Sequence, residues 1–325
     1  MEIVSSTQEK LSTVKTKGVF FEVLVKFALG FWALFIGLLF PLLIALILFY
    51  ESRLAIEKFG FIHFITNANW DPVNEDFGAL TMVIGTIIST LLAVSIATPV
   101  SIGIAIFITE LAPKWLKPIV SGAIELLAAI PSIIYGMWGF FVITPIMANK
   151  VEPWLQATFG SLPLVGALFS GVPTGVDVLT TSLVLSIMII PFMASVVRDS
   201  FNMVPSIMKE SAYGLGATQW EVIRHVVIPY TASGIAGGLI LSTGRALGET
   251  MAVTFLAGNN PQIPKSLFDS FTTITVALAN QFTEADTDIY LSSLYYLSMI
   301  LFLVSFVMLS IAKFMVLRLE KRWKV

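Results

Sequence analysis

Two charged residues stand four positions apart in an otherwise weakly polar stretch, Gly244-Arg245-Ala246-Leu247-Gly248-Glu249-Thr250. This stretch is expected to lie inside the fifth predicted helix, so Arg245 and Glu249, four residues apart, share one face and can interact. An arginine at membrane depth costs about 2.5–3.5 kcal/mol on insertion scales, so such a residue usually faces a cavity or a partner. Two hypotheses follow. Either Arg245 meets an anion on a translocation path, with Glu249 orienting or gating its charge, or the two form an internal ion pair that fixes subunit packing.

A polar segment, ESAYGLGATQWEVIRHVVIP from Glu210 to Pro229, precedes this stretch and separates two apolar runs. Gly214 and Gly216 permit a sharp turn between two short helices. Thr218 can cap the second helix, and Glu221 completes a capping box. We expect the second helix to end before the proline. A polar helix–turn–helix in so apolar a chain indicates a surface that is presented to a partner.

Glu125 is a third charge close to an apolar run, and a weaker candidate for a functional intramembrane charge. It follows Lys117 by about two helical turns. The sequence therefore leaves open whether Glu125 has a functional role or only reaches the cytoplasmic interface.

The elements that must position these residues are membrane-spanning helices. The chain has 325 residues, of which 56% are hydrophobic and 12% charged, whereas soluble domains carry roughly 25% charged residues. A bilayer core of about 30 Å needs roughly 20 apolar residues in a helix. Runs of that kind occur at Phe27–Tyr50, Phe77–Thr109, Leu126–Asn149, Val178–Val197, Val226–Gly244 and Ile289–Ala312. They predict an all-α polytopic membrane protein with six transmembrane helices, because backbone groups in lipid must be satisfied within each segment.

Several chemistries are excluded by composition. The chain has no cysteine, and its two histidines, His63 and His225, are too far apart to suggest a metal site. It has no Gly-x-x-x-x-Gly-Lys-[Ser/Thr] phosphate loop. We therefore expect a non-catalytic subunit without a cofactor or metal of its own, and any ATP and Mg²⁺ would bind a separate chain.

Basic residues predict the orientation. Fourteen of the nineteen lysines and arginines fall in segments 1–26, 110–118, 198–225 and 313–325, which the positive-inside rule places in the cytoplasm together with both termini. The other loops are acidic, with Glu152 and Asp177 in the second of them. These acidic loops are either solvated surface or a docking surface for a soluble outer partner.

The expected organisation has three parts. Residues 1–77 hold a cytoplasmic tail (1–18), the first transmembrane helix and an outer segment. Residues 78–317 form one transmembrane domain with a cytoplasmic loop at 204–229, and residues 318–325 form a second tail. The predicted fifth helix follows the loop directly, so we expect one continuous helix to connect the loop with Arg245.

The loop also carries a family signature. Its sequence resembles the "EAA" motif of ABC-importer permeases, Glu-Ala-Ala, three residues, Gly, nine residues, Ile, one residue, Leu-Pro. The matching positions, three of them with conservative departures, are Glu210, Ser211, Ala212, Gly216, Val226, Ile228 and Pro229. In that family this element is the coupling helix that docks on the ATP-binding subunit. The resemblance implies a type I ABC importer permease fold.

Three further stretches are similar to the phosphate-importer permeases of the PstC family. They are FITELAP at 107–113, ELLAAIPS at 125–132 with YGMWG at 135–139, and GRALGETMAV at 244–253. The resemblance implies an inner-membrane heterodimer with a PstA-like permease, two PstB-like ATPase subunits and a periplasmic phosphate-binding protein. It also implies that Arg245 and Glu249 act in transport.

Two alternatives remain open from the residues alone. Another oxyanion, such as sulfate or molybdate, would suit the same arginine. A stand-alone secondary transporter or channel is a different class of protein, against which the coupling element and the lack of a paired inverted half both argue.

Overall fold

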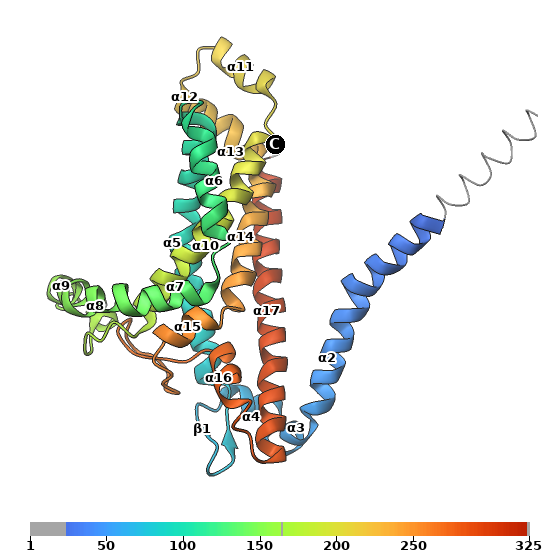
Figure 1. Cartoon of the computed structure of the whole chain (residues 1–325), viewed down its shortest axis with the longest axis vertical. Helices are drawn as coiled ribbons and strands as arrows, with labels where there is room; N and C mark the ends of the chain where they lie inside the picture. The colour runs from blue at the N-terminus through green and yellow to red at the C-terminus, as the bar shows by residue number, and fades with distance from the viewer. Residues whose placement is uncertain (1–23, 164, 324–325) are drawn as a thin grey trace, which may run out of the picture.

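The computed structural model describes residues 24–163 and 165–323 (Figure 1). The predicted tail, 1–18, lies outside these residues. Five helices are long and apolar enough to cross a membrane, or six if one bent pair counts as a single span. The predicted all-α class is confirmed, with one small exception, an antiparallel pairing of β1 (Trp70–Asp71) with β2 (Asp76–Phe77).

The elements, with η denoting π- or 3-10-helical turns, have the following bounds. They are η1 (Phe35–Leu39), α2 (Phe40–Glu51), α3 (Arg53–Phe59), α4 (Phe61–Thr66), β1, β2, α5 (Leu80–Ile106), η2 (Phe107–Leu111), α6 (Leu116–Ala128), α7 (Ser132–Trp138), η3 (Gly139–Ile143), α8 (Thr144–Ile146), η4 (Met147–Val151), α9 (Glu152–Phe159), η5 (Gly166–Phe169), α10 (Val178–Asn202), α11 (Ser206–Gly214), α12 (Gln219–Val222), η6 (Ile223–Val227), α13 (Ile228–Tyr230), α14 (Ala232–Leu247), α15 (Met251–Leu256), α16 (Ile274–Gln281) and α17 (Asp288–Trp323).

The centre of the molecule is a bundle in which α5 packs along α10, and α14 packs against α10 and α17 (Figure 1). Alanines of α5, Ala93 and Ala97, meet Val184, Leu185 and Met188 of α10 in one buried apolar cluster. Small residues let helices approach closely in a membrane protein. The predicted second, fourth and sixth spans are confirmed as α5 with η2, α10 and α17.

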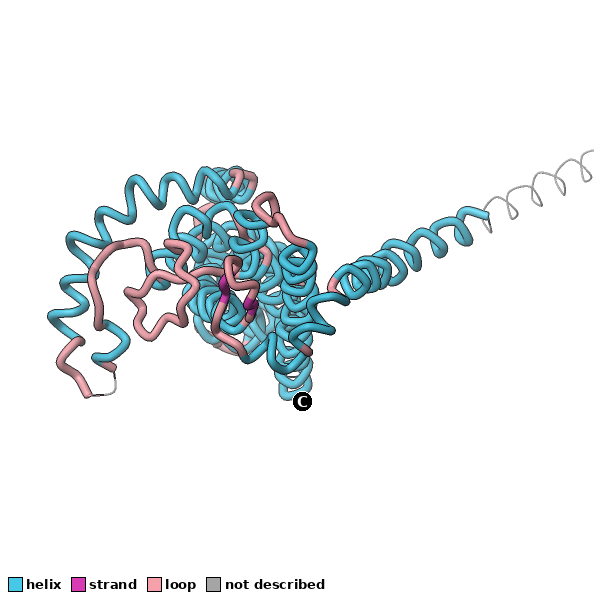
Figure 2. Tube along the Cα trace, turned by 90° about the horizontal axis from the view of Figure 1, so that it is seen from below, coloured by secondary structure: helices cyan, strands magenta, loops and turns pink. Residues whose placement is uncertain are grey.

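The predicted third span, Leu126–Asn149, is wrong as a single helix. α6 ends at Ala128, and Pro131 stands as the N-cap of α7 with an extended backbone. A proline cannot donate the hydrogen bond that would continue the preceding helix. The helix that follows runs unbroken from Ser132 to Phe159, and it leaves the bundle sideways from the end of α6 (Figures 1 and 2).

The predicted fifth span is also divided. The helix Gln219–Tyr230 meets Ala232–Leu247 at an angle of 67°, so the expected continuous helix from the loop to Arg245 is wrong. The expected end of the first of these helices before Pro229 is wrong as well, because α13 contains the proline. The turn before Pro229 is the π-helical η6, a widening of the kind that accommodates irregular hydrogen bonding in a helix.

Two groups of elements lie at opposite ends of the molecule. α11 and α12 project at one end, and the β1–β2 hairpin and α16 lie at the opposite end (Figure 1). We call these the coupling end and the outer end, after the positions that the sequence predicts for them. At the outer end the segment that follows the first helix folds back onto α16 and α17, where the Trp70 Nε1 donates to Gln281 Oε1 at 2.6 Å. The first helix, Leu24–Glu51, contacts α17 at its C-terminal end, where Ser292 Oγ donates to Glu51 O at 2.7 Å, and it leads away from the bundle toward its N-terminus (Figure 1). Nothing in its most apolar window is buried.

Candidate coupling surface and substrate path

The coupling segment, residues 204–229, forms the predicted helix–turn–helix. α12 begins after a complete capping box, in which Glu221 N donates to Thr218 Oγ1 at 3.4 Å and Thr218 N donates to Glu221 Oε2 at 2.8 Å. The Glu221 carboxyl accepts hydrogen bonds from Thr218 N and Thr218 Oγ1, and both lower its pKa. The capping prediction is confirmed.

The turn after α11 explains the spacing between Ala212 and Gly216. Ala217 N donates to Ala212 O at 3.1 Å, and Gly216 N donates to Tyr213 O at 2.9 Å, which is the hydrogen-bond pattern of a Schellman helix end. Gly216 occupies the position that requires a left-handed backbone, with φ +89°. Glycine adopts that conformation without the penalty that a Cβ brings.

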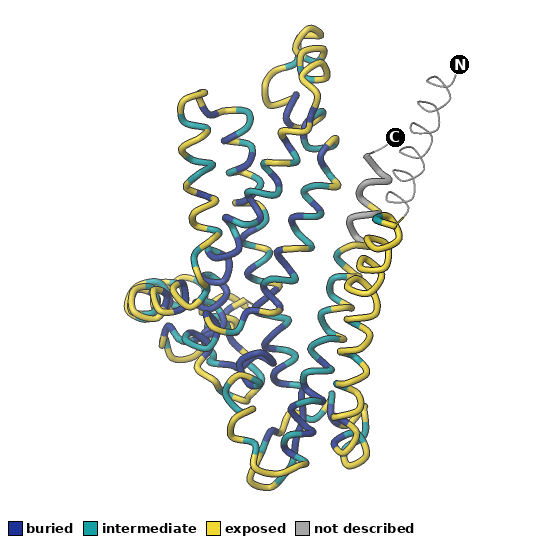
Figure 3. Tube along the Cα trace, turned by 45° about the vertical axis from the view of Figure 1, so that its right-hand side comes forward, coloured by how far each residue is buried: buried dark blue, intermediate teal, exposed yellow. Residues whose placement is uncertain are grey.

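The motif residues divide between two faces of the segment. Ala212, Val226 and Ile228 pack against the buried cluster that includes Phe201 of α10 and Val222 of α12. Pro229 is half-buried in α13, whereas Glu210, Ser211 and Gly216 are exposed. One part of the motif therefore fixes the segment to the bundle, and the other part faces outward (Figure 3).

The outward face carries large apolar side chains that the sequence analysis did not single out. Leu215 is 91% exposed at the turn, Ile207 is 66% exposed and Trp220 is 59% exposed. An exposed apolar patch with a polar rim is typical of a protein-binding surface. The sequence offered one signal for them, since large apolar residues in a polar segment indicate either a packed or a binding face.

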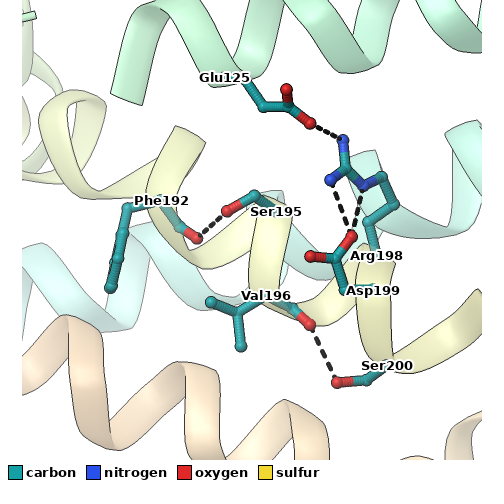
Figure 4. Close-up of polar contacts among 7 residues, drawn as sticks. All are labelled: Glu125, Phe192, Ser195, Val196, Arg198, Asp199 and Ser200. Carbon is teal, nitrogen blue, oxygen red and sulfur yellow. Dashed lines mark hydrogen bonds and ion pairs between the residues drawn. The ribbon is translucent and has the colours of Figure 1, made fainter. Parts of the chain in front are cut away.

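Glu125 joins the polar network at the coupling end (Figure 4). Its Oε1 lies 3.0 Å from Arg198 Nη1, and Arg198 also pairs with Asp199 at 2.7 Å. The side chains of Glu125 and Asp199 are each 61% exposed. The ion pair gives Glu125 a partner within this chain, and its place at the cytoplasmic interface stays a prediction.

Arg245 lies in the last turn of α14, half-buried inside the bundle. Its Nε is buried without a hydrogen-bond partner, and its guanidinium carbon lies 5.6 Å from the centre of the Phe192 ring. Within residues 24–163 and 165–323, no carboxylate lies at ion-pair distance from it. The arginine thus keeps unsatisfied hydrogen-bonding capacity and a positive charge that no described carboxylate balances.

Glu249 does not share a helix with Arg245, so that prediction is wrong. α14 ends at Leu247, and Gly248 to Thr250 separate it from α15, which begins at Met251. Glu249 is 8% exposed, and its Oε1 accepts a hydrogen bond from Ala252 N at 3.2 Å. A carboxylate is favourable at a helix N-terminus, and this local partner replaces the expected arginine.

The acidic outer loops are not uniformly solvated. Glu152 and Asp177 are both fully buried, and Thr180 connects them, since its N donates to Asp177 Oδ1 at 2.8 Å and its Oγ1 to Glu152 Oε1 at 3.4 Å. Burial, and also the neighbouring Glu152, raises the pKa of Asp177 to about 8. The expectation of a solvated loop is wrong for these two residues, which fasten the start of α9 to the start of α10.

The fold and these surfaces define a class: a membrane transport permease with a coupling element at one end. Comparison with known proteins agrees. Residues 100–325 match the family described as "Binding-protein-dependent transport system inner membrane component". The chain is 50% identical over 301 residues to the phosphate transport system permease protein PstC of Pasteurella multocida, covering 93% of each chain, and 36% identical to a probable PstC of Methanocaldococcus jannaschii, covering 90% and 91% of the two chains. The chain belongs to the PstC family of these permeases.

Solved structures confirm the fold. A bacterial alginate ABC transporter, determined in complex with an alginate pentasaccharide-bound periplasmic protein, matches 95% of this chain and 98% of its own with a TM-score of 0.58 and 19% identity. This similarity establishes the ABC importer permease fold.

Proposed function

We propose that this chain is a permease subunit of an ATP-driven phosphate importer in the inner membrane. The similarity to PstC relatives over nine-tenths of the chain carries the substrate assignment. Arg245 supplies the matching chemistry, because a positive charge in a bundle of apolar helices, with no carboxylate partner among the described residues, suits an oxyanion.

Arg245 would contact phosphate on its path through the bundle. A guanidinium offers several N–H donors in a planar fork that fits phosphate oxygens. One such group holds the anion weakly enough for release, which conduction requires. Glu249 would stabilise the N-terminus of α15, by accepting the hydrogen bond from Ala252 N, rather than neutralise Arg245.

The coupling segment would dock on an ATPase subunit, with Leu215, Ile207 and Trp220 as apolar anchors. ATP and Mg²⁺ would bind that subunit and not this chain, in keeping with the lack of a phosphate loop in the sequence. By the family relationship the complete importer would contain a PstA-like second permease, two PstB-like ATPases and a periplasmic phosphate-binding protein. Both termini would lie in the cytoplasm, as the distribution of basic residues predicts.

Selective uptake tests the substrate. The chain is reconstituted into liposomes with its partner permease, the ATPase and the binding protein, and uptake of labelled phosphate is measured against excess sulfate or molybdate. We expect neither competitor to reduce phosphate uptake. Inhibition by the excess sulfate or molybdate would favour the broader oxyanion alternative.

Arg245→Gln tests the site in the same liposomes. We expect uptake to be lost while the complex still assembles, because glutamine keeps much of the side-chain volume but not the charge. The control is Arg53→Gln, since Arg53 lies outside the bundle with its guanidinium 4.6 Å from the Tyr50 ring. Normal uptake by Arg245→Gln would show that this arginine has a structural role only.

A further inference from the structure

Glu110 is a polar junction between the coupling segment and the bundle. It lies in η2, which continues α5 without a break, and its side chain is only 8% exposed. Its Oε1 lies 2.6 Å from the Nζ of Lys209 in α11. The residue that precedes the EAA-like motif is thus bound to the end of a central helix.

The second helix of the segment reaches the same residue. Gln219, the first residue of α12, donates from its Nε2 to the backbone oxygen of Glu110 at 2.9 Å. The neighbouring carbonyl, that of Thr109, accepts a hydrogen bond from Lys117 Nζ. Both helices of the coupling segment therefore contact Glu110. Lys117 holds the neighbouring residue, Thr109, in place.

From Glu110, α5 leads directly toward Arg245. Near its coupling end Ala105 packs in the cluster that supports the coupling segment. Further along, Ala93 and Ala97 pack in a second buried cluster together with Ala246, the residue next to Arg245. The covalent route along the chain is bent by 67° between α13 and α14, so α5 is the straighter connection between the two places.

The ion pair of Lys209 with Glu110 is suited to transmit movement because separating the two charges costs free energy. A nearly buried carboxylate that loses its cation keeps the cost of desolvation without compensation. A movement of α11 therefore tends to carry Glu110 and the end of α5 with it. An exposed pair, such as Lys58 with Glu75, at 2.9 Å and with side chains 42% and 39% exposed, lacks this constraint.

We propose that Glu110 is a positioning residue that couples the ATPase-docking segment to α5, through Lys209 and Gln219. This inference rests on the proposed function, since it presumes that ATP drives transport through the coupling segment. It assigns α5, and not the chain directly after the segment, as the element that conveys the ATPase movement to the surroundings of Arg245.

The test compares two rates in liposomes that contain the complete complex: ATP hydrolysis stimulated by the binding protein, and phosphate uptake. For Glu110→Gln and for Lys209→Gln we expect assembly and hydrolysis to persist while the phosphate imported per ATP falls roughly tenfold. A factor of roughly ten corresponds to the lower end of the free energy of a hydrogen bond to a charged group. The double variant should cost no more than either single one. Glu75→Gln, which removes the exposed pair, is the matched control and should leave the ratio unchanged.

The outcomes are distinguishable. If the unaltered complex imports no phosphate with ATP, the proposed function fails. If it does, and both variants retain the normal ratio, the inference is overturned. If Glu110→Gln does not assemble, Lys209→Gln decides the question, because Lys209 is more exposed, at 22%. Loss of assembly in both variants would assign the contact to folding and also overturn the inference.

Discussion

Replacing Gly216 by alanine should weaken the docking of the ATPase without unfolding the chain. Gly216 has a φ of +89°, and a Cβ built there meets no atom within 4 Å. The cost of the alanine is therefore backbone strain alone, roughly 1–2 kcal/mol for a left-handed residue that has a Cβ. That strain lowers the ratio of the native turn to its altered conformations by a factor of roughly 5–30.

Gly214 provides the matched control. It is the last residue of α11, a Cβ there also meets no atom within 4 Å, and its φ is not in the left-handed range. Alanine at this helical position should be neutral or stabilising, by up to about 1 kcal/mol. The two variants add the same methyl group two residues apart and differ only in the backbone conformation that each position requires.

The assay is titration of the ATPase subunit onto the permease heterodimer in lipid nanodiscs, with the melting temperature of each variant measured in parallel. We expect Gly216→Ala to raise the Kd of the ATPase by roughly 5–30-fold and to reduce ATPase stimulation, and Gly214→Ala to leave both unchanged. Equal affinity and equal stimulation in the two variants would refute the argument that this turn shapes the docking surface.

Three further outcomes follow from the same surfaces. Leu215→Ser should weaken ATPase binding but not lower the melting temperature, because Leu215 is 91% exposed; a lower melting temperature with unchanged binding would contradict this. Thr218→Ala should cost about 1 kcal/mol of helix stability through loss of the cap, measured as reduced amide protection in α12 by hydrogen exchange, and unaltered protection would count against the capping role. The pKa of Asp177, about 8 against an ordinary 3.8, means that the folded state keeps a proton that the unfolded state releases, so the free energy of unfolding falls as the pH rises through this range. Asp177→Asn should flatten that pH dependence in detergent melts, and an unchanged profile would contradict the assignment.

The coupling segment was largely predictable because its signals are local. A capping box and a glycine that ends a helix depend on residues within one or two turns of each other, and both are found where the sequence places them. The apolar spans α5, α10 and α17 were predictable for a similar reason, because the thickness of the bilayer sets the length of each apolar run.

The break beside Arg245 was not predictable from spacing alone. Residues four apart suggest a shared helix face, but the stretch 245–249 also allows Gly248 to follow the end of one helix and Glu249 to accept a hydrogen bond from the first turn of the next. Glycine weakens a helix, and a carboxylate favours a helix N-terminus. These preferences prevailed over the expected ion pair. The proline at 131 divided the predicted third span for a related reason, since it cannot continue the hydrogen bonding of α6.

Long-range polar contacts lay beyond the sequence analysis. Glu110 and Lys209 are separated by 99 positions, and Glu152 reaches Thr180 across 28. The first pair meets where the coupling segment packs on the end of α5, and the second where the start of α9 lies against the start of α10. Their sequence context, a charge at the end of an apolar run, is the same for a solvated residue and for a buried one.

The ATP dependence of phosphate uptake tests most directly whether this chain is a permease subunit driven by a separate ATPase. The measurement is uptake of labelled phosphate into liposomes that hold either this chain alone or the chain with its partner permease, the ATPase and the binding protein, each with and without enclosed ATP. We predict uptake only by the complete complex and only with ATP. Uptake by this chain alone, or by the complex without ATP, would contradict the claim that it is a permease subunit driven through its coupling segment.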